Sequence, residues 1–232
     1  AFTDDDCLPA PGWLEAGLAR LDSSGAGIVQ GRTLPDPAVQ LEGWWRSITI
    51  DRFSHRYETC NIFYRTDVLR VLGGFDEGPK FDLKTGHGGE DVELGWRARR
   101  RGVEAIFAPE ALVHHAVTFP GLGFLLRAAW HVGNWTILIR RFPEMRRELL
   151  VYRVFMGRRD GAFLAAVAGI AIAPVWLPAL ALAAPYALLW LGRNPPRLEW
   201  HAIIGKLAEV PFDAAVVAGL LVGSVRERTL VL

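Results

Sequence analysis

Residues 161–192 contain no charged side chain, whereas residues 1–160 mix charged and apolar positions as a water-soluble domain does. A helix needs about 20 apolar residues to cross a bilayer, so the uncharged stretch is long enough to span a membrane. Pro174, Pro178 and Pro185 interrupt it, which is compatible with one kinked helix or with a tight re-entrant pair of helices. The other alternative is a helix buried in a protein core, which the length of the uncharged run disfavours.

Basic residues are distributed unequally on the two sides of this stretch. Seven arginines lie within residues 140–159, and residues 193–206 hold fewer basic side chains. Flanks rich in Lys and Arg stay on the cytoplasmic side of a membrane. We therefore expect residues 1–160 to be cytoplasmic and the protein to lie at the inner cell membrane.

Shifts in composition predict four segments. Residues 1–145 form a soluble α/β domain, residues 146–160 an arginine-rich juxtamembrane linker, and residues 161–192 the transmembrane or re-entrant segment. Residues 193–232 form a C-terminal tail. Within this tail, residues 210–225 are apolar but short and contain a proline and an aspartate, so we expect a helix that lies on the membrane surface and not a second span.

Charge and cysteine content exclude several classes of protein. The formal net charge is +1, so no overall field attracts nucleic acid. Cys7 and Cys60 are the two cysteines, too few for a disulfide framework, and no Cys/His spacing suggests zinc. No basic stretch followed by an apolar one stands at the N-terminus, so we expect no signal peptide.

Short strands and helices are expected along residues 1–145, with Leu14, Leu18 and Leu21 on the apolar face of the first helix. We expect strands at residues 1–3, 28–30, 60–64 and 103–108, the last ended by Pro109, and an extended segment at 112–115. Helices are expected at 12–21, 66–72, 90–101 and 124–141, with a further helix carrying Trp44 and Trp45. A loop is expected at 31–40 and an irregular stretch at 51–59.

Three neighbouring carboxylates, Asp4, Asp5 and Asp6, follow the first strand. They repel one another and are costly to gather without a cation. Alternate residues of an extended chain point to one side, so Asp4 and Asp6 are placed to share a hard metal ion while Asp5 faces away. The alternative is an acidic turn that caps the next helix.

A glycine-rich approach, residues 86–89, delivers Glu90 and Asp91 to the start of a helix. Glu93 and Arg97 stand four residues apart and can pair, and Gly102 can end the helix. The functional interpretation is a rigid helix start that holds a catalytic base at the edge of a cleft. The alternative is that Glu90 or Asp91 only caps the helix.

His114 and His115 close the extended segment. A lone histidine in such a place is more often structural than a ligand. Beside an acidic metal site it becomes a plausible third ligand, because imidazole binds manganese.

Four segments in this order resemble those of the GT-A glycosyltransferases of family 2, which are membrane-associated inverting enzymes that use nucleotide sugars. Residues 1–14 resemble the family's DxD metal-binding segment and the helix after it. Residues 61–77 resemble the segment before the acceptor site, residues 89–94 with Arg97 the ED motif, and residues 113–115 the position of a metal-binding histidine. The resemblance covers about residues 1–145 and implies a partial GT-A (Rossmann-like) α/β domain followed by a membrane-associated helical region.

The resemblance implies a role for each matching residue. Asp4 and Asp6 hold Mn²⁺ or Mg²⁺, with His115 favoured over His114 as the third ligand. Asp91 is the catalytic base, and Glu90 orients the loop or binds the acceptor. A further set belongs to the donor or acceptor site, namely Asp5, Asn61, Gly74, Phe75, Gly89, Arg97 and His114.

The implied partners are a UDP-, GDP- or dTDP-sugar, a glycan or lipid-linked acceptor, and a membrane. The Gln-x-x-Arg-Trp motif of processive synthases is absent, which favours the addition of one or a few sugars in glycan, cell-envelope polysaccharide or glycolipid synthesis. The family's nucleotide-binding βαβ portion, which precedes the DxD segment, is not matched here. The chain therefore resembles the C-terminal part of such an enzyme, and the alternative is an inactive fragment or an accessory membrane-bound binding subunit.

Overall fold

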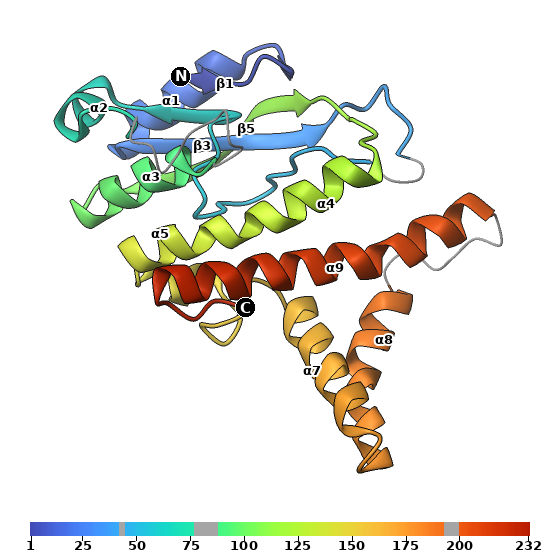
Figure 1. The fold of residues 1–232 in the computed structure, drawn as a ribbon. Helices are drawn as coiled ribbons and strands as arrows, with labels where there is room; N and C mark the ends of the chain where they lie inside the picture. The colour runs from blue at the N-terminus through green and yellow to red at the C-terminus, as the bar shows by residue number, and fades with distance from the viewer. Residues whose placement is uncertain (42–44, 77–87, 193–199) are drawn as a thin grey trace. The chain divides into compact units, whose positions relative to one another are not determined.

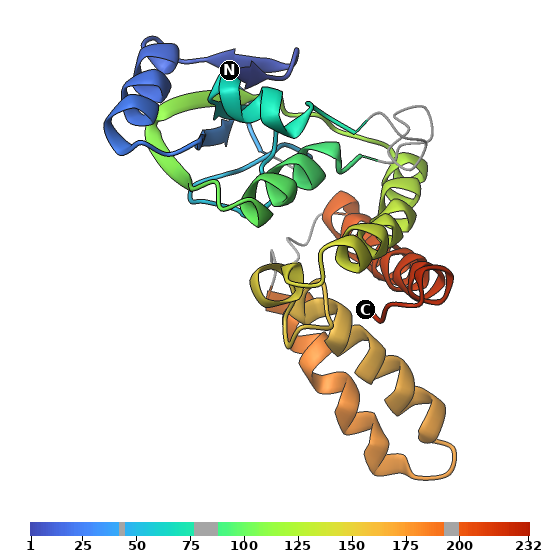
Figure 2. The same cartoon turned by 90° about the vertical axis from the view of Figure 1, so that its left-hand side faces the viewer.

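The computed structural model describes residues 1–41, 45–76, 88–192 and 200–232. These residues form two compact units, which we call unit 1 (Ala1–Pro120) and unit 2 (Gly121–Leu232) and describe separately (Figures 1 and 2). Unit 1 is a sheet with helices, and unit 2 is helical.

Unit 1 is built on a five-stranded mixed sheet in the order β1-β4-β3-β5-β2. Its strands are β1 (Phe2–Thr3), β2 (Cys7–Pro9), β3 (Ile28–Pro35), β4 (Asn61–Tyr64) and β5 (Ala105–His115). β3 and β5 are parallel, and the other three pairs are antiparallel. The expected α/β fold is confirmed.

Helices cover both faces of this sheet (Figure 1). Among the described residues of unit 1, the helices are α1 (Trp13–Ser24), α2 (Thr66–Leu72) and α3 (Glu90–Arg100). α1 packs on one face, where Leu21 joins Val29 and Phe63 in the core. α3 lies on the other side of the strands (Figure 1). Helix α2 has the expected bounds, because Gly73 and Gly74 both adopt positive φ angles and stop it.

The apolar face expected for α1 is wrong in part. Leu21 is buried, but Leu14 and Leu18 are 44% and 46% exposed. The helix instead approaches the sheet through Gly17, where an added Cβ atom would lie 2.1 Å from the Phe63 ring. The absence of a side chain at Gly17 therefore sets how closely helix and sheet pack.

β3 and β5 are both longer than expected. β3 continues to Pro35, so the loop expected from residue 31 is wrong in its first half, and Pro109 does not end β5. The register shifts between Gly31 and Arg32, so that Pro109 falls within an irregular part of the ladder where its missing N–H is not needed.

Asn61, on β4, stabilises the β3–β5 pair where its register shifts. Its Nδ2 donates to the carbonyl oxygens of Arg32 and Ala111, each at 2.8 Å, and its Oδ1 accepts from Trp13 Nε1 at 2.8 Å. The side chain is fully buried and uses both ends of its amide. It joins α1, β3 and β5 at the point where the ladder is interrupted.

The helix expected to carry Trp44 and Trp45 is wrong for Trp45, and Trp44 lies outside the described residues. Downstream of Trp45 the chain is extended: Arg46 bridges to Thr118, and Ile50 bridges to Thr33 of β3. Backbone pairing with the sheet overrides the local helical pattern here.

Unit 2 contains α4 (Leu122–His131), η3 (Val132–Asn134), α5 (Trp135–Arg141), α6 (Met145–Leu149), α7 (Arg158–Ile172), η4 (Leu177–Ala183), α8 (Ala184–Gly192) and α9 (Trp200–Glu227). The helix expected over residues 124–141 is present, with a 3₁₀ turn in its middle. α4 and α5 precede the expected segment limit at residue 145, yet they pack against α9 within unit 2.

α7 and the η4–α8 segment pack against each other as a helical hairpin. Of the two forms expected for residues 161–192, the structure has the tight pair and not one kinked helix. α9 is longer than the helix expected at 210–225, and its part Gly205–Glu227 is long and apolar enough to cross a membrane, judged by length and composition alone.

We expect Asn61→Ala to lower the free energy of unfolding by about 2–4 kcal/mol, because it removes three hydrogen bonds, of which the one to Ala111 is buried and those to Arg32 and Trp13 are partly buried. Urea denaturation followed by tryptophan fluorescence measures this. Val71→Ala is the control, since Val71 is 71% exposed, and should change stability by less than about 0.5 kcal/mol. Equal losses in the two variants would contradict the role of the amide.

Candidate functional site

The acidic residues form a turn between β1 and β2 and not an extended chain. Cys7 N–H donates to the Asp4 carbonyl oxygen at 3.2 Å, which makes Asp5 and Asp6 the central residues of a β-turn. The expected alternation along a strand is therefore wrong as the reason for the grouping. The grouping itself is present, because Asp4 and Asp6 converge and Asp5 does not join them.

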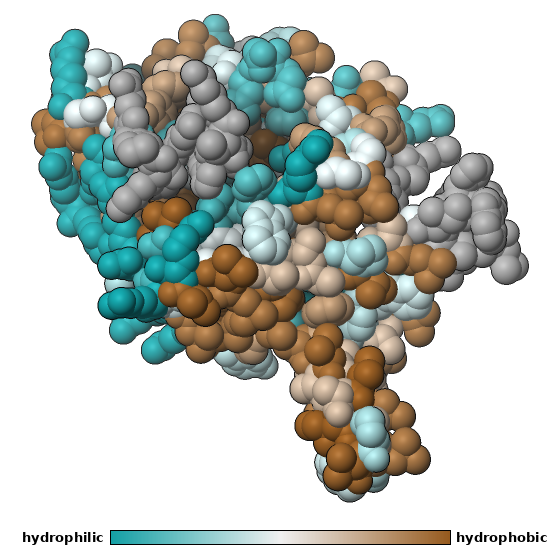
Figure 3. Space-filling model, in the orientation of Figure 1, coloured by the Kyte–Doolittle hydropathy of each residue, from teal (hydrophilic) through white to brown (hydrophobic). Residues whose placement is uncertain are grey.

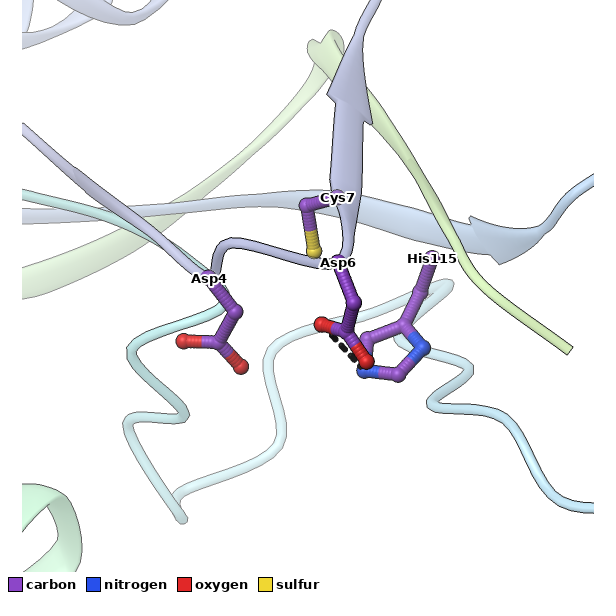
Figure 4. Close-up of side chains that lie close together, drawn as sticks. All are labelled: Asp4, Asp6, Cys7 and His115. Carbon is purple, nitrogen blue, oxygen red and sulfur yellow. Dashed lines mark ion pairs between the residues drawn. The ribbon is translucent and has the colours of Figure 1, made fainter. Parts of the chain in front are cut away.

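Four side chains converge at this turn, namely Asp4, Asp6, Cys7 and His115 (Figure 4). One ligand atom from each lies within 4.8 Å of those of the others. The Asp6 carboxylate is 3.6 Å from His115 Nε2. Residues more than a hundred positions apart are brought together because β2 pairs with the end of β5.

His115 is oriented by its second ring nitrogen. Its Nδ1 lies 2.8 Å from the carbonyl oxygen of Ala116, which can only accept, so Nδ1 carries the proton in this contact. In the neutral ring, Nε2 then presents its lone pair toward Asp6. A hydrogen bond from the far nitrogen to a carbonyl is the usual support of a histidine metal ligand.

His114 lies on the opposite face of the sheet from His115, because adjacent residues of a strand alternate. Its Nδ1 is buried and has no hydrogen-bond partner among the described residues. His115, and not His114, therefore lies on the face of the acidic turn.

Cys7 is the member of the cluster that the sequence reasoning missed. It is directly opposite His115 in the antiparallel β2–β5 pair, so the two side chains share a face. Burial raises the pKa of its thiol. Recognising it from sequence would have required knowing both the turn at Asp4–Cys7 and the register of two distant strands.

The donor set suits a divalent cation. Carboxylate oxygens are the ligands that Mg²⁺ and Mn²⁺ prefer, and imidazole is accepted by Mn²⁺. Burial, followed by repulsion from Asp6, raises the pKa of the Asp4 carboxyl. A cation between these carboxylates would offset that repulsion. The residues present therefore fit the metal that the resemblance implies.

Asp91 stands in the first turn of α3, after Gly89, whose φ of 126° is not accessible at low cost to other residues. Burial, with further contributions from the charges of Glu90 and Glu58, raises the pKa of Asp91 to about 7. Its Oδ1 also accepts the Val92 N–H at 2.7 Å. A carboxyl with a pKa near neutrality is matched to proton transfer.

The start of α3 is held by a buried ion pair. Glu93 is fully buried, and both of its oxygens accept from Arg97, at 2.8 to 3.1 Å. Arg97 also donates to the carbonyl oxygens of Leu72, at 2.5 Å, and Gly74, at 2.7 Å. The expected pairing of Glu93 with Arg97 is confirmed, and it ties the end of α2 to α3.

Two observations relate the start of α3 to the cluster of Asp4, Asp6, Cys7 and His115. The ring of Phe2, from the strand that leads into Asp4, packs edge to face on Phe75 at 5.5 Å and on Tyr64 at 6.0 Å. The charge of Glu90 is close enough to contribute to the raised pKa of Asp4.

Tyr64 is a second residue that the sequence reasoning missed. Its hydroxyl is buried without a hydrogen-bond partner in the described part of the chain. Burial, with a contribution from the nearby charge of Asp91, raises the pKa of this hydroxyl. Strand alternation places Tyr64 opposite the α1 face, but its proximity to Asp91 depends on how α3 packs.

The expected site residues thus fall into separate groups. Asp4, Asp6 and His115 converge, and the segment that carries Phe75 and Gly74 is tied to the Asp91 helix. Asn61 is engaged inside the sheet. Residues 86 and 87 of the glycine-rich approach lie outside the described residues.

The family follows from the sequence comparison. A family model described as glycosyltransferase like family 2 matches residues 1–130, which include Asp4, Asp6, His115 and Asp91. The chain belongs to this family. The match spans all of unit 1 and the first helix turns of unit 2.

Curated relatives of this family 2 chain are glycosyltransferases by name. The pre-mycofactocin glycosyltransferase of Mycobacterium tuberculosis is 28% identical over 165 residues, which cover 65% of this chain and 34% of the relative. The glycosyltransferase AglE of Haloferax volcanii is 30% identical over 148 residues, 60% of this chain and 45% of the relative. The chain spans about a third to a half of the length of the relatives it matches.

We expect the cluster to bind Mn²⁺, as measured by calorimetry on the full chain in detergent. Asp4→Asn combined with Asp6→Asn should abolish binding, and His115→Gln should weaken it about tenfold or more. His114→Gln is the matched control, since His114 lies on the other face, and should bind as the wild type does. Equal effects at the two histidines would contradict the assignment.

A second expectation concerns pH. The pKa of Asp91 is raised from 3.8 to about 7 in the folded chain, so the folded state holds the proton more tightly than the unfolded state. The stability from this difference is present below about pH 4 and is lost as the pH rises through about 7. Asp91→Asn cannot ionise and should lose this decline.

The measurement is the unfolding free energy of both proteins between about pH 4 and pH 8. Asp67→Asn serves as the control, because the Asp67 side chain is 76% exposed. Parallel curves for the wild type and Asp91→Asn would show that the buried carboxyl does not titrate in this range.

Proposed function

We propose that the protein transfers a sugar from a nucleotide-diphosphate sugar to an acceptor hydroxyl, with inversion of the anomeric configuration and with a divalent metal. The observation that carries the proposal is the convergence of Asp4, Asp6 and His115 at one end of the sheet. Membership of family 2 supports sugar transfer as the reaction class.

Asp4, Asp6 and His115 would hold Mn²⁺ or Mg²⁺. When bound, the ion supplies charge that stabilises the leaving nucleotide diphosphate. Cys7 adds a thiol to the same cluster. The turn from Asp4 to Cys7 and the hydrogen bond from His115 to Ala116 hold these side chains in place without the ion.

Asp91 acts as the general base in this proposal. It takes the proton from the acceptor hydroxyl as that oxygen attacks the anomeric carbon, and a pKa of about 7 leaves it partly ionised near neutral pH. Glu90 lies beside it, and its Oε2 accepts the Gly89 N–H at 2.9 Å, which supports a role in shaping the turn before the helix. Arg97 positions the base through its hydrogen bonds to the Glu93 carboxylate and the Gly74 carbonyl oxygen.

The remaining residues of the proposed donor and acceptor site divide by their contacts. Gly74 and Phe75 lie on the segment bound to the Asp91 helix, which supports a place near the acceptor. Asn61 and His114 act on the site through the sheet, because one is fully engaged in it and the other lies on its far side. Asp5 is exposed at the turn and is free to meet the donor.

The proposed donor is a UDP-, GDP- or dTDP-sugar, and the proposed acceptor is a glycan or a lipid-linked sugar. We place the reaction at the cytoplasmic face of the inner membrane. The arginines that precede residues 161–192 and the apolar α9 support a membrane location.

The test combines binding with turnover in the full chain. Mn²⁺ binding should strengthen in the presence of UDP, and transfer from a panel of nucleotide sugars should fall about 10²- to 10⁴-fold in Asp91→Asn with Mn²⁺–UDP binding retained. kcat/KM of the wild type should rise with pH around an apparent pKa of about 7.

Transfer by Asp91→Asn at the wild-type rate would remove Asp91 from the mechanism. A folded wild-type chain that binds neither Mn²⁺ nor UDP would favour the alternative of an inactive or accessory binding subunit. Asp67→Asn, whose side chain is 76% exposed, is the control for Asp91→Asn and should leave the rate unchanged.

A further inference from the structure

The hairpin of α7, η4 and α8 has its large apolar side chains on the outside. Val175, Trp176 and Leu177 at its turn are 93%, 61% and 69% exposed. Large apolar residues are also exposed along both legs, namely Val167, Ile170, Ile172, Leu180, Leu182, Leu188, Leu189 and Leu191. The free end of the hairpin is strongly apolar on the face shown in Figure 3.

The seam between the two legs is made of small residues. Ala162, Ala166, Gly169 and Ala179 are the buried positions of the hairpin. A Cβ atom added at Gly169 would lie 2.5 Å from the Ala179 carbonyl oxygen, so the legs meet almost backbone to backbone. Small residues inside and large apolar residues outside are typical of helices packed within lipid, and a hairpin in water would have the opposite arrangement.

A polar network closes the base of the hairpin. Arg159, in the first turn of α7, donates to Asp213 and to Glu209 of α9, each at 2.7 Å. Tyr186 of α8 donates to the same Asp213 oxygen at 2.6 Å, and Lys206 pairs with Glu209 at 3.2 Å. The uncharged part of the hairpin therefore begins directly beyond a compensated set of charges.

The first leg of the hairpin is too short to cross a bilayer. The uncharged part of α7, Gly161–Ile172, is about 18 Å long at 1.5 Å per residue. The hydrocarbon core is about 30 Å thick, so this leg reaches just beyond its middle before the chain turns back. Arginines precede the hairpin, with Arg153 and Arg158 exposed near its base, and they are complementary to anionic lipid headgroups.

Among the described residues, α9 is the helix that is long and apolar enough to cross a membrane, but its packing argues against a crossing. It is packed along α4 and α5, and its Gly219 approaches Trp130 so closely that an added Cβ atom would lie 2.3 Å from that carbonyl oxygen. α4 carries Arg127 exposed, and Arg140 of α5 pairs with Glu227 at 3.3 Å. Arg127 and Arg140 lie on the helices that pack along α9, and charged side chains of this kind favour the membrane surface over its core.

We propose that the α7–η4–α8 hairpin inserts into the cytoplasmic leaflet of an anionic bilayer as a re-entrant anchor, and that neither it nor α9 crosses the membrane. The occupant of the exposed apolar surface is lipid. The inference rests on the proposed membrane location and is independent of the proposed chemistry.

The test is the topology of the full chain added to preformed sealed vesicles of phosphatidylcholine and phosphatidylglycerol. Cys7 and Cys60 are buried, so single cysteines introduced elsewhere can be labelled in the native background. Arg158→Cys before the hairpin and Arg228→Cys after α9 should both react with a membrane-impermeant maleimide added outside. A bimane probe on Val175→Cys should be quenched most by lipids brominated near the ends of their acyl chains.

Protection of Arg228→Cys until the vesicles are opened would show that the chain crosses the membrane and would overturn the proposed topology, while the membrane location would stand. Reaction of Val175→Cys with the impermeant maleimide in bound protein would overturn insertion. A wild-type chain that does not bind vesicles would overturn the membrane location and the anchor together. None of these outcomes bears on sugar transfer, which is measured in detergent.

A second variant tests the tip directly. Val175→Asp combined with Leu177→Asp should weaken vesicle binding about tenfold or more, because carboxylates are strongly disfavoured in hydrocarbon. Both positions are exposed, so the fold should survive, as circular dichroism would verify. Val71→Asp, at an equally exposed apolar position of unit 1, is the matched control and should bind as the wild type does. Unchanged binding of the double variant would overturn the proposal.

Discussion

The amide of Asn61 is the interaction on which the candidate site depends most. Its hydrogen bonds hold β3 and β5 together where their register shifts, so β5 continues beyond Pro109 and reaches His115. His115 then lies opposite Cys7 and beside the acidic turn. A buried amide that satisfies backbone groups on two strands is specific in a way that apolar packing is not, because a shift by one residue would leave it unpaired.

The second organising interaction is the buried pair of Glu93 and Arg97. A carboxylate taken fully out of water is tolerated because the guanidinium meets both of its oxygens. Arg97 uses its remaining donors on the end of α2, so one side chain fixes the helix start and the turn at Gly74. Asp91 lies two residues before Glu93, at the head of the helix that this pair holds, and burial there raises its pKa.

Local patterns were enough to predict some parts of the structure and not others. The helix over Thr66–Leu72 was predictable because adjacent glycines end it, whereas the extension of β5 depends on donors from Asn61, far away in sequence. The convergence of Asp4, Asp6 and His115 was predictable because an acid cluster and a histidine in this order are distinctive. The way in which these side chains converge and the presence of Cys7 among them were not predictable. Both follow from a turn and a strand register that only the folded sheet defines.

The residues of the cluster come from opposite ends of the sheet-forming segment of the chain. Asp4 and Asp6 follow β1, the first strand, and His115 ends β5, the last strand. A cation bound there would cross-link two chain segments that separate on unfolding. Binding to the folded state alone adds RT ln(1 + [M]/Kd), about 2.7 kcal/mol when the free ion is at a hundred times its Kd. With the proposed metal bound, the melting temperature would therefore report metal occupancy, and chelators in a purification buffer would destabilise the sheet as well as empty the site.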